Sequence, residues 1–390
     1  MVTLTFPPRF GGIEAYYHHL CNELPADKIV VLAPNTPGED DFDRNQHYTI
    51  VRKPMINPVV PRWPKGWFGI IKLASTIRWM NLIRSIDHAV RLHHIELIQA
   101  GQVLPLGTLA LWYFRKHKIP YIFYAHGMDI TLPQRFIRKK TLLKNVIKNA
   151  HAIVANSEHT KRELVSMGAT PEQVTVIYPC PNITATEPAQ SVVDNISNNF
   201  HLAGKQLLLT VARLVERKGH DMVIKALPQI IKQVPNVSYV ILGDGPYRKN
   251  LENLVAELKL GRYVQFVGAR PQSEMSAWYE LSDVFIMPAR QLPNGDVEGF
   301  GIAYLEANLF AKPVIGGNSG GVPEAVADNI SGLLVNPTDV DDIAKAAIKL
   351  LTDTSLAQRL GIQGMDRVHK DFSWGKQAQE LKKVLSYATR

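Results

Sequence analysis

The chain lacks the features that mark an exported, disulfide-bonded or membrane-spanning protein. Cys21 and Cys180 are the only cysteines among its 390 residues, too few for a disulfide framework or a cysteine metal site. The longest apolar run, residues 104–114, is broken by Pro105 and Gly107 and is shorter than the roughly 20 residues of a spanning helix. No charged start leads into an apolar stretch and a cleavage site. We therefore expect a cytoplasmic protein with two buried, chemically inert cysteines.

Excess positive charge is confined to one half of the chain. Residues 1–180 hold 22 Lys and Arg against 13 Asp and Glu, whereas residues 181–390 hold 22 of each kind. Such a surplus favours an anionic partner, which could be a lipid headgroup, a phosphorylated acceptor or a nucleic acid. A merely solvated basic surface is the alternative.

Short apolar, β-branched runs alternate with longer segments of helical spacing, which predicts an α/β protein with two parallel, doubly wound sheets. The predicted strands are 28–33, 95–100, 120–124, 152–155 and 174–177, then 207–211, 237–242, 264–267, 284–287, 313–315 and 332–335. A stretch rich in Pro, Asn, Thr and Ser separates the two groups. The predicted domains are residues 1–182 and 205–373, with a linker at 183–204 and a final helix at 374–390.

Cations and glycines follow the strands of the second sheet, at the edge where open parallel sheets bind ligands. Arg213 and Lys218 follow its first strand and could hold a diphosphate. The alternative is that they are two solvated surface charges. Gly243, Val267 and Met287 end or follow the next three strands and could line the same crevice. The turn at residues 243–246 (GDGP) lacks the third glycine of a dinucleotide-binding fingerprint, which disfavours a nicotinamide enzyme.

A second anion site is predicted where Phe300, Gly301 and Ile302 lead into a helix, because free backbone N–H groups gather at a helix start. Glu298 and Glu306 lie eight residues apart around this point and could accept hydrogen bonds from sugar hydroxyls. A glutamate near a helix start can also simply complement the helix dipole.

Glu298 and Glu306 form the E-x7-E motif of retaining glycosyltransferases, and the chain resembles glycosyltransferase family 4, particularly its phosphatidylinositol mannosyltransferase-like members. The resemblance implies the GT-B fold, with two Rossmann-like domains facing across a cleft and a C-terminal helix crossing back to the first domain. The similar segments run nearly from end to end: 7–14 (PPRFGGIE), 126–127 (HG), 156–157 (NS), 213–218, 243–246 (GDGP), 319–324 (SGGVPE) and 372–374 (FSW).

The resemblance also implies roles for these residues. Arg213 and Lys218 would stabilise the leaving diphosphate, while Glu306 would hold the ribose and Glu298 the hydroxyls of the donor sugar. The implied reaction is transfer of a hexose from a nucleotide diphosphate sugar to a lipid-linked or glycan acceptor of the cell envelope. GDP-mannose is the expected donor, with UDP-glucose and UDP-N-acetylglucosamine as alternatives.

The first domain supplies the other implied contacts. His126 would lie beside the donor sugar, and the amides around Gly11 and Gly12 would face the diphosphate when the domains close. Met1 already lies within the first strand, where relatives have several residues before it, so we expect this strand to be short and frayed. Residues 178–182 also differ from the Pro-Asn-Gly-Val-Asp that relatives commonly have near the domain junction.

No credible metal site is present in the sequence. Asp41 and Asp43 have Asp-x-Asp spacing but lie in an acidic surface segment. We therefore expect no catalytic metal and no cofactor, with Arg213, Lys218 and backbone amides stabilising the leaving group. The leaving phosphate oxygen could take the acceptor proton, so His126 is expected to position and stabilise rather than to act as a base.

Three other functions are compatible with parts of this pattern. A nucleotide-sugar epimerase would use the same crevice without an acceptor, and a non-catalytic binding protein could retain the fold. Nucleic-acid binding ranks last, because the basic half lacks a regular pattern of stacking aromatics.

Two segments of the basic half favour peripheral attachment to the cytoplasmic face of an inner membrane. A helix predicted within 135–148 carries one cationic face, with Lys140, Lys144 and Lys148 on it and Phe136, Leu143 and Ile147 off it. Residues 62–68 set two tryptophans and a phenylalanine beside cations, a pairing typical of the lipid headgroup layer. A solvated helix face with buried tryptophans is the alternative.

Overall fold

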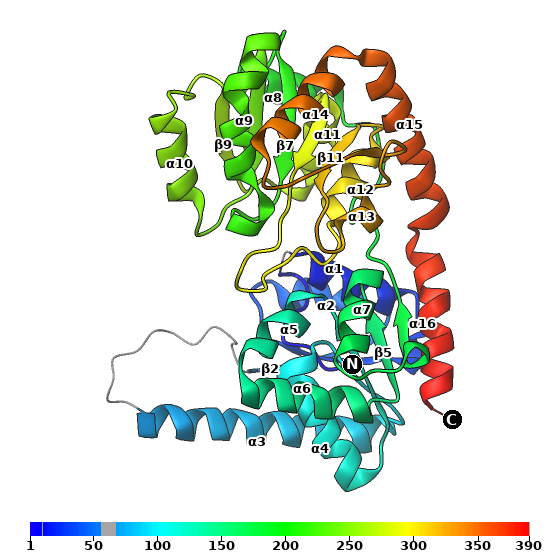
Figure 1. The fold of residues 1–390 in the computed structure, drawn as a ribbon. Coiled ribbons are helices and arrows are strands. Elements are labelled where there is room, and N and C mark those ends of the chain that lie inside the picture. Colours follow the sequence, from blue (N-terminus) through cyan, green and yellow to red (C-terminus); the bar gives the residue numbers. More distant parts are fainter. Residues whose placement is uncertain (10, 56–67, 390) are drawn as a thin grey trace. The chain divides into compact units, whose positions relative to one another are not determined.

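Every strand in the described part of the chain pairs in parallel with its neighbours. The computed structural model describes residues 1–9, 11–55 and 68–389, without the side chains of 68–78. The chain forms two units (Figure 1): unit 1 is Met1–Pro179 with Trp374–Arg390, and unit 2 is Cys180–Ser373.

The sheet of unit 1 is joined at its centre by the first residues of the chain. Val2 bridges Leu32 on one side and Ala100 on the other, so the expected short first strand is reduced to an isolated bridge. It links a β1-β2 pair to a four-stranded sheet of order β3-β4-β5-β6. These strands are β1 (Val30–Pro34), β2 (Thr49–Lys53), β3 (Ile98–Ala100), β4 (Tyr121–Ala125), β5 (Ala152–Ala155) and β6 (Val174–Val176).

Helices cover this sheet, and the last helix of the chain is one of them. Leu381 and Val384 of α16 are buried in one apolar core with Tyr16 and Leu20 of α1, and the Trp374 ring stacks on His19 at 4.6 Å. The C-terminal helix therefore packs on unit 1. The helices are α1 (Gly12–Asn22), α2 (Glu39–Arg44), α3 (Phe68–His93), η2 (Val103–Gly107), α4 (Thr108–His117), α5 (Met128–Thr131), η3 (Leu132–Arg135), α6 (Ile137–Asn149), α7 (Glu158–Ser166) and α16 (Trp374–Ala388).

Unit 2 holds a six-stranded sheet of order β12-β11-β10-β7-β8-β9. The chain runs outward from β7 through β8 to β9, then returns to the other side of β7 and runs outward again from β10. The topological switch point of this sheet, where open α/β folds bind ligands, therefore lies between β7 and β10. The strands are β7 (Gln206–Val211), β8 (Val237–Leu242), β9 (Val264–Gly268), β10 (Val284–Met287), β11 (Val314–Gly317) and β12 (Gly332–Val335).

The sheet of unit 2 shares one buried apolar core with residues of α9, α10 and α14, and these three are among the helices that flank it. The flanking helices are α8 (Gln190–Asn199), η5 (Glu216–Lys218), α9 (His220–Gln233), α10 (Arg248–Glu257), α11 (Met275–Leu281), α12 (Ile302–Leu309), α13 (Val322–Ala325), α14 (Val340–Thr352) and α15 (Thr354–Asp371).

The α/β class with two parallel sheets is confirmed, and each predicted strand overlaps an observed one. One strand, β2, was not predicted, because its partly exposed sequence reads as polar. The expected linker at 183–204 needs correction: it contains α8, which packs against α11 and buries Ile196. The apolar residues of α8 were too few to outweigh the surrounding Pro, Asn and Ser.

Candidate functional site

Two loops meet at the switch point of unit 2. The loop after β7 carries residues 212–219, and the loop after β10 carries residues 288–301. They are joined through the backbone, since the Arg290 N–H donates to the Arg217 carbonyl at 2.8 Å. Gly219 permits this approach: it has a φ of 78°, and a Cβ on it would lie 2.2 Å from the Pro288 carbonyl oxygen.

Charged side chains of these two loops form a compact cluster. The Lys218 Nζ lies 2.7 Å from Glu298 Oε2, and both side chains are 12% exposed. Arg217 Nε lies 3.5 Å from the same carboxylate oxygen and 3.6 Å from Asp296 Oδ1. Two cations therefore face two carboxylates, whereas the side chain of Arg213 is exposed and takes part in no ion pair within the described ranges.

The cluster shifts the pKa values of its members in directions that follow from burial and pairing. Burial alone would raise the pKa of Glu298, but Lys218 and Arg217 lower it below its ordinary value. Burial lowers the pKa of Lys218, and the attraction of Glu298 opposes this. Burial raises the pKa of Asp296. Glu298 is therefore an ionised carboxylate whose charge balances the Lys218 ammonium.

A buried ion pair anchors the loop after β10 to helix α9. Arg290 binds Asp221 through two hydrogen bonds, at 2.9 and 3.0 Å, and the two residues are 9% and 6% exposed. Asp221 lies in the first turn of α9, directly after the Lys218 loop. This two-pronged contact fixes both loops to the same point of the scaffold.

Glu306 lies on α12 and is held separately from the Lys218 cluster. Its Oε2 accepts a hydrogen bond from the Tyr279 hydroxyl at 2.9 Å, and its Oε1 accepts one from the Asn182 N–H at 3.3 Å. Burial raises its pKa. Gly301 is the N-cap of α12 and lies between the two glutamates in the sequence. Its φ of 99° favours glycine, and a Cβ there would lie 2.5 Å from the Tyr304 ring.

In unit 1, His126 directly follows β4 and faces the hydroxyl of Tyr17 from α1. The His126 Nε2 and the Tyr17 oxygen are 2.6 Å apart, and the Tyr17 hydroxyl also contacts the Gly101 carbonyl. A carbonyl can only accept, so the Tyr17 hydroxyl donates to Gly101. The His126 backbone N–H donates to Asp129 at 2.8 Å.

The glycine loop before α1 is shaped by Glu14. Its carboxylate accepts a hydrogen bond from the Thr5 hydroxyl and lies 3.6 Å from Arg9 Nε. A Cβ on Gly11 would lie 2.2 Å from Glu14 Oε2, so a larger residue there would displace the glutamate side chain. Gly12 begins α1.

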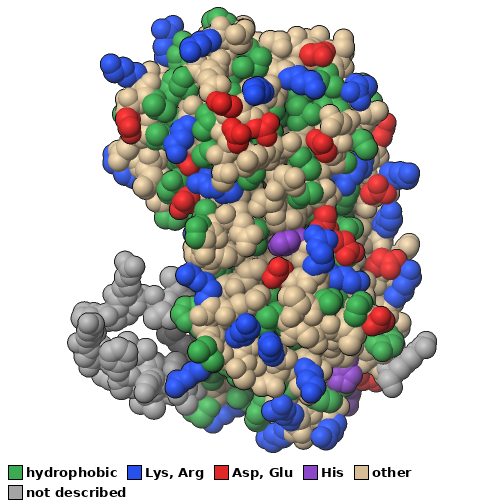
Figure 2. All heavy atoms as spheres, viewed as in Figure 1, with side chains coloured by type: hydrophobic (Ala, Val, Ile, Leu, Met, Phe, Trp, Pro, Cys, Tyr) green, Lys and Arg blue, Asp and Glu red, His purple; other side chains and the backbone are tan. Residues whose placement is uncertain are grey.

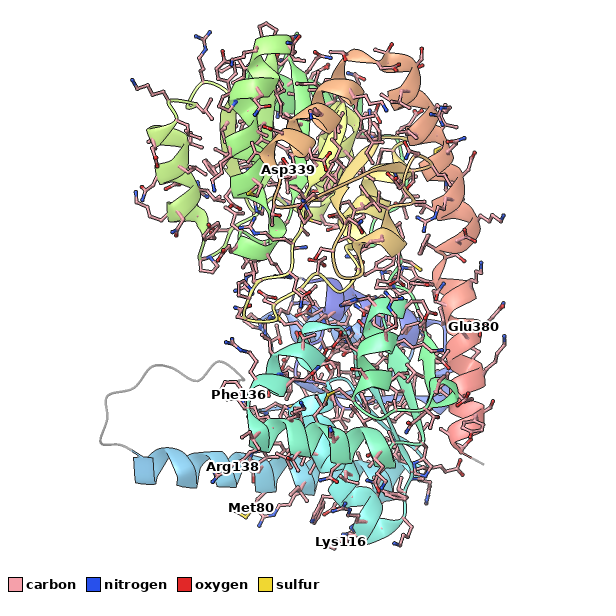
Figure 3. All side chains as sticks on the ribbon, in the orientation of Figure 1. Met80, Lys116, Phe136, Arg138, Asp339 and Glu380 are labelled. Carbon is pink, nitrogen blue, oxygen red and sulfur yellow. The ribbon has the colours of Figure 1, made fainter. Side chains whose placement is uncertain are left out.

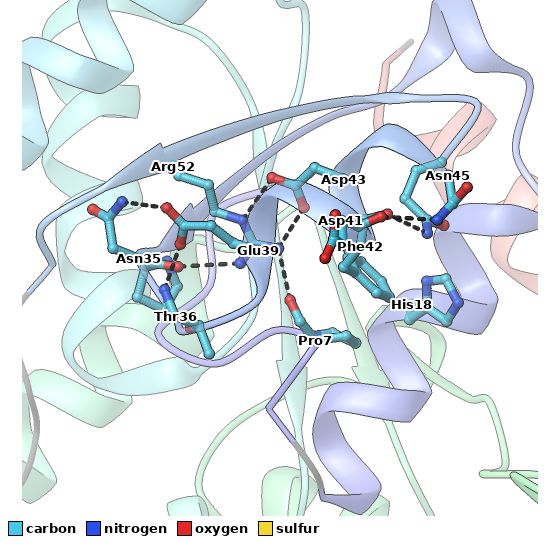
Figure 4. Close-up of polar contacts among 12 residues, drawn as sticks. Pro7, His18, Asn35, Thr36, Glu39, Asp41, Phe42, Asp43, Asn45 and Arg52 are labelled. Atoms are coloured by element: carbon cyan, nitrogen blue, oxygen red, sulfur yellow. Dashed lines mark hydrogen bonds and ion pairs between the residues drawn. The ribbon is translucent and has the colours of Figure 1, made fainter.

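Arg52 of β2 holds the other end of the same loop, as Figure 4 shows. Its guanidinium donates to the Pro7 carbonyl at 2.6 Å and to the Pro34 carbonyl at 3.1 Å, and it pairs with Asp43 at 2.7 Å. Asp41 pairs with Arg44 instead. The two aspartates with Asp-x-Asp spacing therefore serve as partners of arginines.

Two family models cover nearly all of the chain between them. Glycosyltransferase Family 4 matches residues 10–184, and Glycosyl transferases group 1 matches residues 193–367. The GDP-mannose-dependent alpha-(1-6)-phosphatidylinositol monomannoside mannosyltransferase of Mycobacterium tuberculosis is 30% identical over 388 residues, covering 98% of this chain and 96% of that protein.

The chain belongs to glycosyltransferase family 4. The enzyme of the same description from Mycolicibacterium smegmatis is 29% identical over 391 residues, 99% of this glycosyltransferase and 97% of that enzyme. Family membership makes the protein a transferase, in place of the epimerase and the non-catalytic binding protein.

Solved structures show that this glycosyltransferase has the GT-B fold. HepE of Anabaena in complex with UDP-glucose superposes with a TM-score of 0.79 at 20% identity, covering 99% of this chain and 98% of that chain. Sucrose-phosphate synthase of Thermosynechococcus elongatus gives a TM-score of 0.77 at 21% identity, with the same coverage.

Eight of the predicted site residues of the glycosyltransferase fall into three groups. Lys218 and Glu298 touch each other, and Arg213 lies in the same loop as Lys218. Gly243 and Val267 lie at the ends of β8 and β9, and Ile302 begins α12. Contact of these residues with a nucleotide stays a prediction. Met287 and Phe300 are buried, with 0% and 2% of their surface exposed, so they serve the core in this structure.

Sequence reasoning missed several members of the site. Arg217 and Asp296 belong to the charged cluster, and their signal was available: the carboxylates at 296 and 298 alternate along one loop, opposite adjacent cations at 217 and 218. Tyr17 gave no such signal, because nothing in its spacing points to a histidine 109 residues away.

We predict that His126 stays uncharged across the pH range in which the enzyme works. Burial lowers its pKa from the ordinary 6.5 to about 4. Below pH 6.5 the unfolded imidazole binds a proton and the folded one does not, so this group destabilises the fold progressively as pH falls from 6.5 towards 4. Proton NMR titration, with His126→Gln to assign the signal, should show no titration above pH 5.5; a midpoint near 6.5 would contradict the prediction.

Proposed function

We propose that this glycosyltransferase moves mannose from GDP-mannose to a lipid-linked acceptor, with retention of configuration at the sugar. The charged cluster at the switch point of unit 2 carries the proposal, because it supplies cations where a nucleotide diphosphate binds in this class of sheet. The donor and the acceptor class follow the relatives of full-length similarity, which are described as GDP-mannose-dependent and as acting on a phosphatidylinositol mannoside.

The donor diphosphate is expected to replace Glu298 as the ion-pair partner of Lys218. In this structure Lys218 is neutralised by Glu298, while Arg213 is exposed. An arriving diphosphate competes for the Lys218 ammonium and also attracts Arg213. The Glu298 carboxylate is then available to accept hydrogen bonds from sugar hydroxyls, and Arg217 keeps it ionised.

The transfer step needs no further reactant. The bond between the anomeric carbon and the phosphate oxygen breaks, and a bond to the acceptor hydroxyl oxygen forms on the same face of the sugar. The acceptor proton passes to the leaving phosphate oxygen, whose growing charge Arg213 and Lys218 stabilise. His126, held against Tyr17, positions the donor through a hydrogen bond between its ring and a sugar hydroxyl.

The reaction is proposed to be independent of metal ions. Arg213 and Lys218 supply the positive charge that a divalent cation would bring to a diphosphate. Asp41 and Asp43 are paired with arginines. Within residues 1–9, 11–55 and 68–389, no three His, Cys, Asp or Glu side chains gather as metal ligands would.

We also propose that unit 1 attaches to the cytoplasmic face of a membrane through its basic surface. Lys140, Lys144 and Lys148 of α6 are exposed, as the sequence predicted, while Leu143 and Ile147 are buried. Figure 2 shows Lys and Arg side chains gathered over this end of the unit with few acidic groups among them. In the described ranges no helix combines the length and apolarity needed to cross a bilayer. The tryptophans at 63 and 67 lie outside the described residues.

The direct test of the function is a transfer assay in excess EDTA. Purified enzyme is incubated with GDP-mannose, UDP-glucose or UDP-N-acetylglucosamine and with synthetic phosphatidylinositol monomannoside in vesicles. We expect a mannolipid product from GDP-mannose only. Product from a UDP-sugar alone would overturn the donor, activity restored only by magnesium or manganese would overturn the metal-free mechanism, and transfer to glycans but not lipids would overturn the acceptor.

Removing either cation should slow the chemical step. Arg213→Ala and Lys218→Ala are each expected to lower kcat by roughly 100- to 1000-fold, as for other single groups that stabilise a leaving charge. Lys249→Ala, which removes an exposed cation from α10, serves as the matched control and should leave kcat unchanged. Near-normal turnover in both site variants, with unchanged thermal stability, would refute the assignment.

A further inference from the structure

An apolar groove opens on unit 1 between α3, α4 and α6. It encloses about 640 Å³, within the size range of pockets that bind small ligands. Its walls are aliphatic and aromatic, with a single charged side chain, Lys139, among the described lining residues. The apolar walls come from Trp79 and Ile83 of α3, Leu104 of η2, Leu109 and Trp112 of α4, and Leu142 of α6.

Large apolar side chains stand exposed around this groove. Trp112 is 40% exposed, Leu142 45%, Phe136 58% and Ile137 86%. Figure 3 shows Phe136 where the chain enters α6, together with Met80 on α3, which is 42% exposed. Large apolar side chains left exposed near an apolar groove are typical of a binding surface.

Cations surround the same groove. Lys116 lies over the Trp112 ring at 5.1 Å, and Lys139 lies over the Phe136 ring at 4.8 Å. Residues 101–150, which supply most of the groove, hold nine Lys and Arg and a single acidic residue, Asp129. The combination of apolar walls with a cationic rim is complementary to one molecule that has a hydrocarbon chain and an anionic headgroup.

The groove is connected to the His126 site through η2. Leu104 and Pro105 line the groove from η2, and η2 packs against β4 and α5, the elements on either side of His126. The chain enters η2 directly from Gly101, whose carbonyl accepts the Tyr17 hydroxyl at the His126 site. A lipid chain in the groove would therefore contact η2, which packs on the elements that position His126.

We propose that this groove binds one acyl chain of the glycerophospholipid acceptor, with the rim cations contacting the lipid phosphate. The proposal rests on the proposed function in one respect, that the acceptor is a lipid. The groove thereby selects acylated acceptors over their free headgroups and aligns the headgroup with His126.

The binding of a chain is tested without nucleotide or sugar. Vesicles of phosphatidylglycerol with brominated acyl chains quench tryptophans that touch the chains, and Trp112→Phe identifies the share of quenching that comes from Trp112. We expect Leu142→Glu to abolish that share. Leu92→Glu places the same change at a residue of α3 that is 60% exposed and does not line the groove, and it should retain the share. Absence of Trp112 quenching in the wild type, or its persistence in Leu142→Glu, would overturn the proposal.

The identity of the lipid is tested by turnover. With phosphatidylinositol monomannoside as acceptor, Leu142→Glu should lower kcat/KM about tenfold or more, since a charge replaces an apolar contact. With the deacylated acceptor its kcat/KM should be unchanged. Suppose that Leu142→Glu loses the quenching but changes kcat/KM by the same factor with the acylated and the deacylated acceptor. The groove would then hold a lipid of the bulk membrane, and its role in binding the acceptor would be overturned. If neither acceptor is glycosylated, the proposed function fails, and the quenching result still decides the groove.

Discussion

The contact between Lys218 and Glu298 is the interaction on which the site in unit 2 depends. A buried ammonium is costly unless an opposite charge lies close to it, and Glu298 supplies that charge at 2.7 Å. Because the two residues lie on the loops after β7 and β10, their pairing also joins the two sides of the switch point. A diphosphate that takes the place of Glu298 would keep the ammonium neutralised while freeing the carboxylate for the sugar.

The two units use the same design for different purposes. In each, parallel strands end at one edge of a sheet, and glycines let neighbouring loops approach closely at that edge. In unit 2 the loops gather charge, braced by the buried pair of Arg290 and Asp221. In unit 1 they hold a neutral histidine against Tyr17, and η2 connects this site to a groove whose walls are apolar. A charged donor and a partly hydrocarbon acceptor would need two sites of these opposite kinds.

The sequence predicted the strands well because a buried parallel strand is a short run of apolar, β-branched residues with little ambiguity. It failed at β2, where the strand is polar, and at α8, whose few apolar residues are surrounded by residues typical of loops. Among site residues, those defined by local spacing, such as Lys218 and Glu298, could be proposed from sequence. Tyr17 and Arg290 could not, because their roles arise from contacts between segments that only the folded chain brings together.

The central claim, that Lys218 exchanges Glu298 for the donor diphosphate, is tested most directly by the affinities of GDP and GMP. Isothermal titration calorimetry gives the ratio of their Kd values in the wild type and in Lys218→Ala at one ionic strength. Since GMP lacks the phosphate that Lys218 is proposed to bind, the preference for GDP should shrink about tenfold or more in the variant. An undiminished preference for GDP in Lys218→Ala would contradict the account.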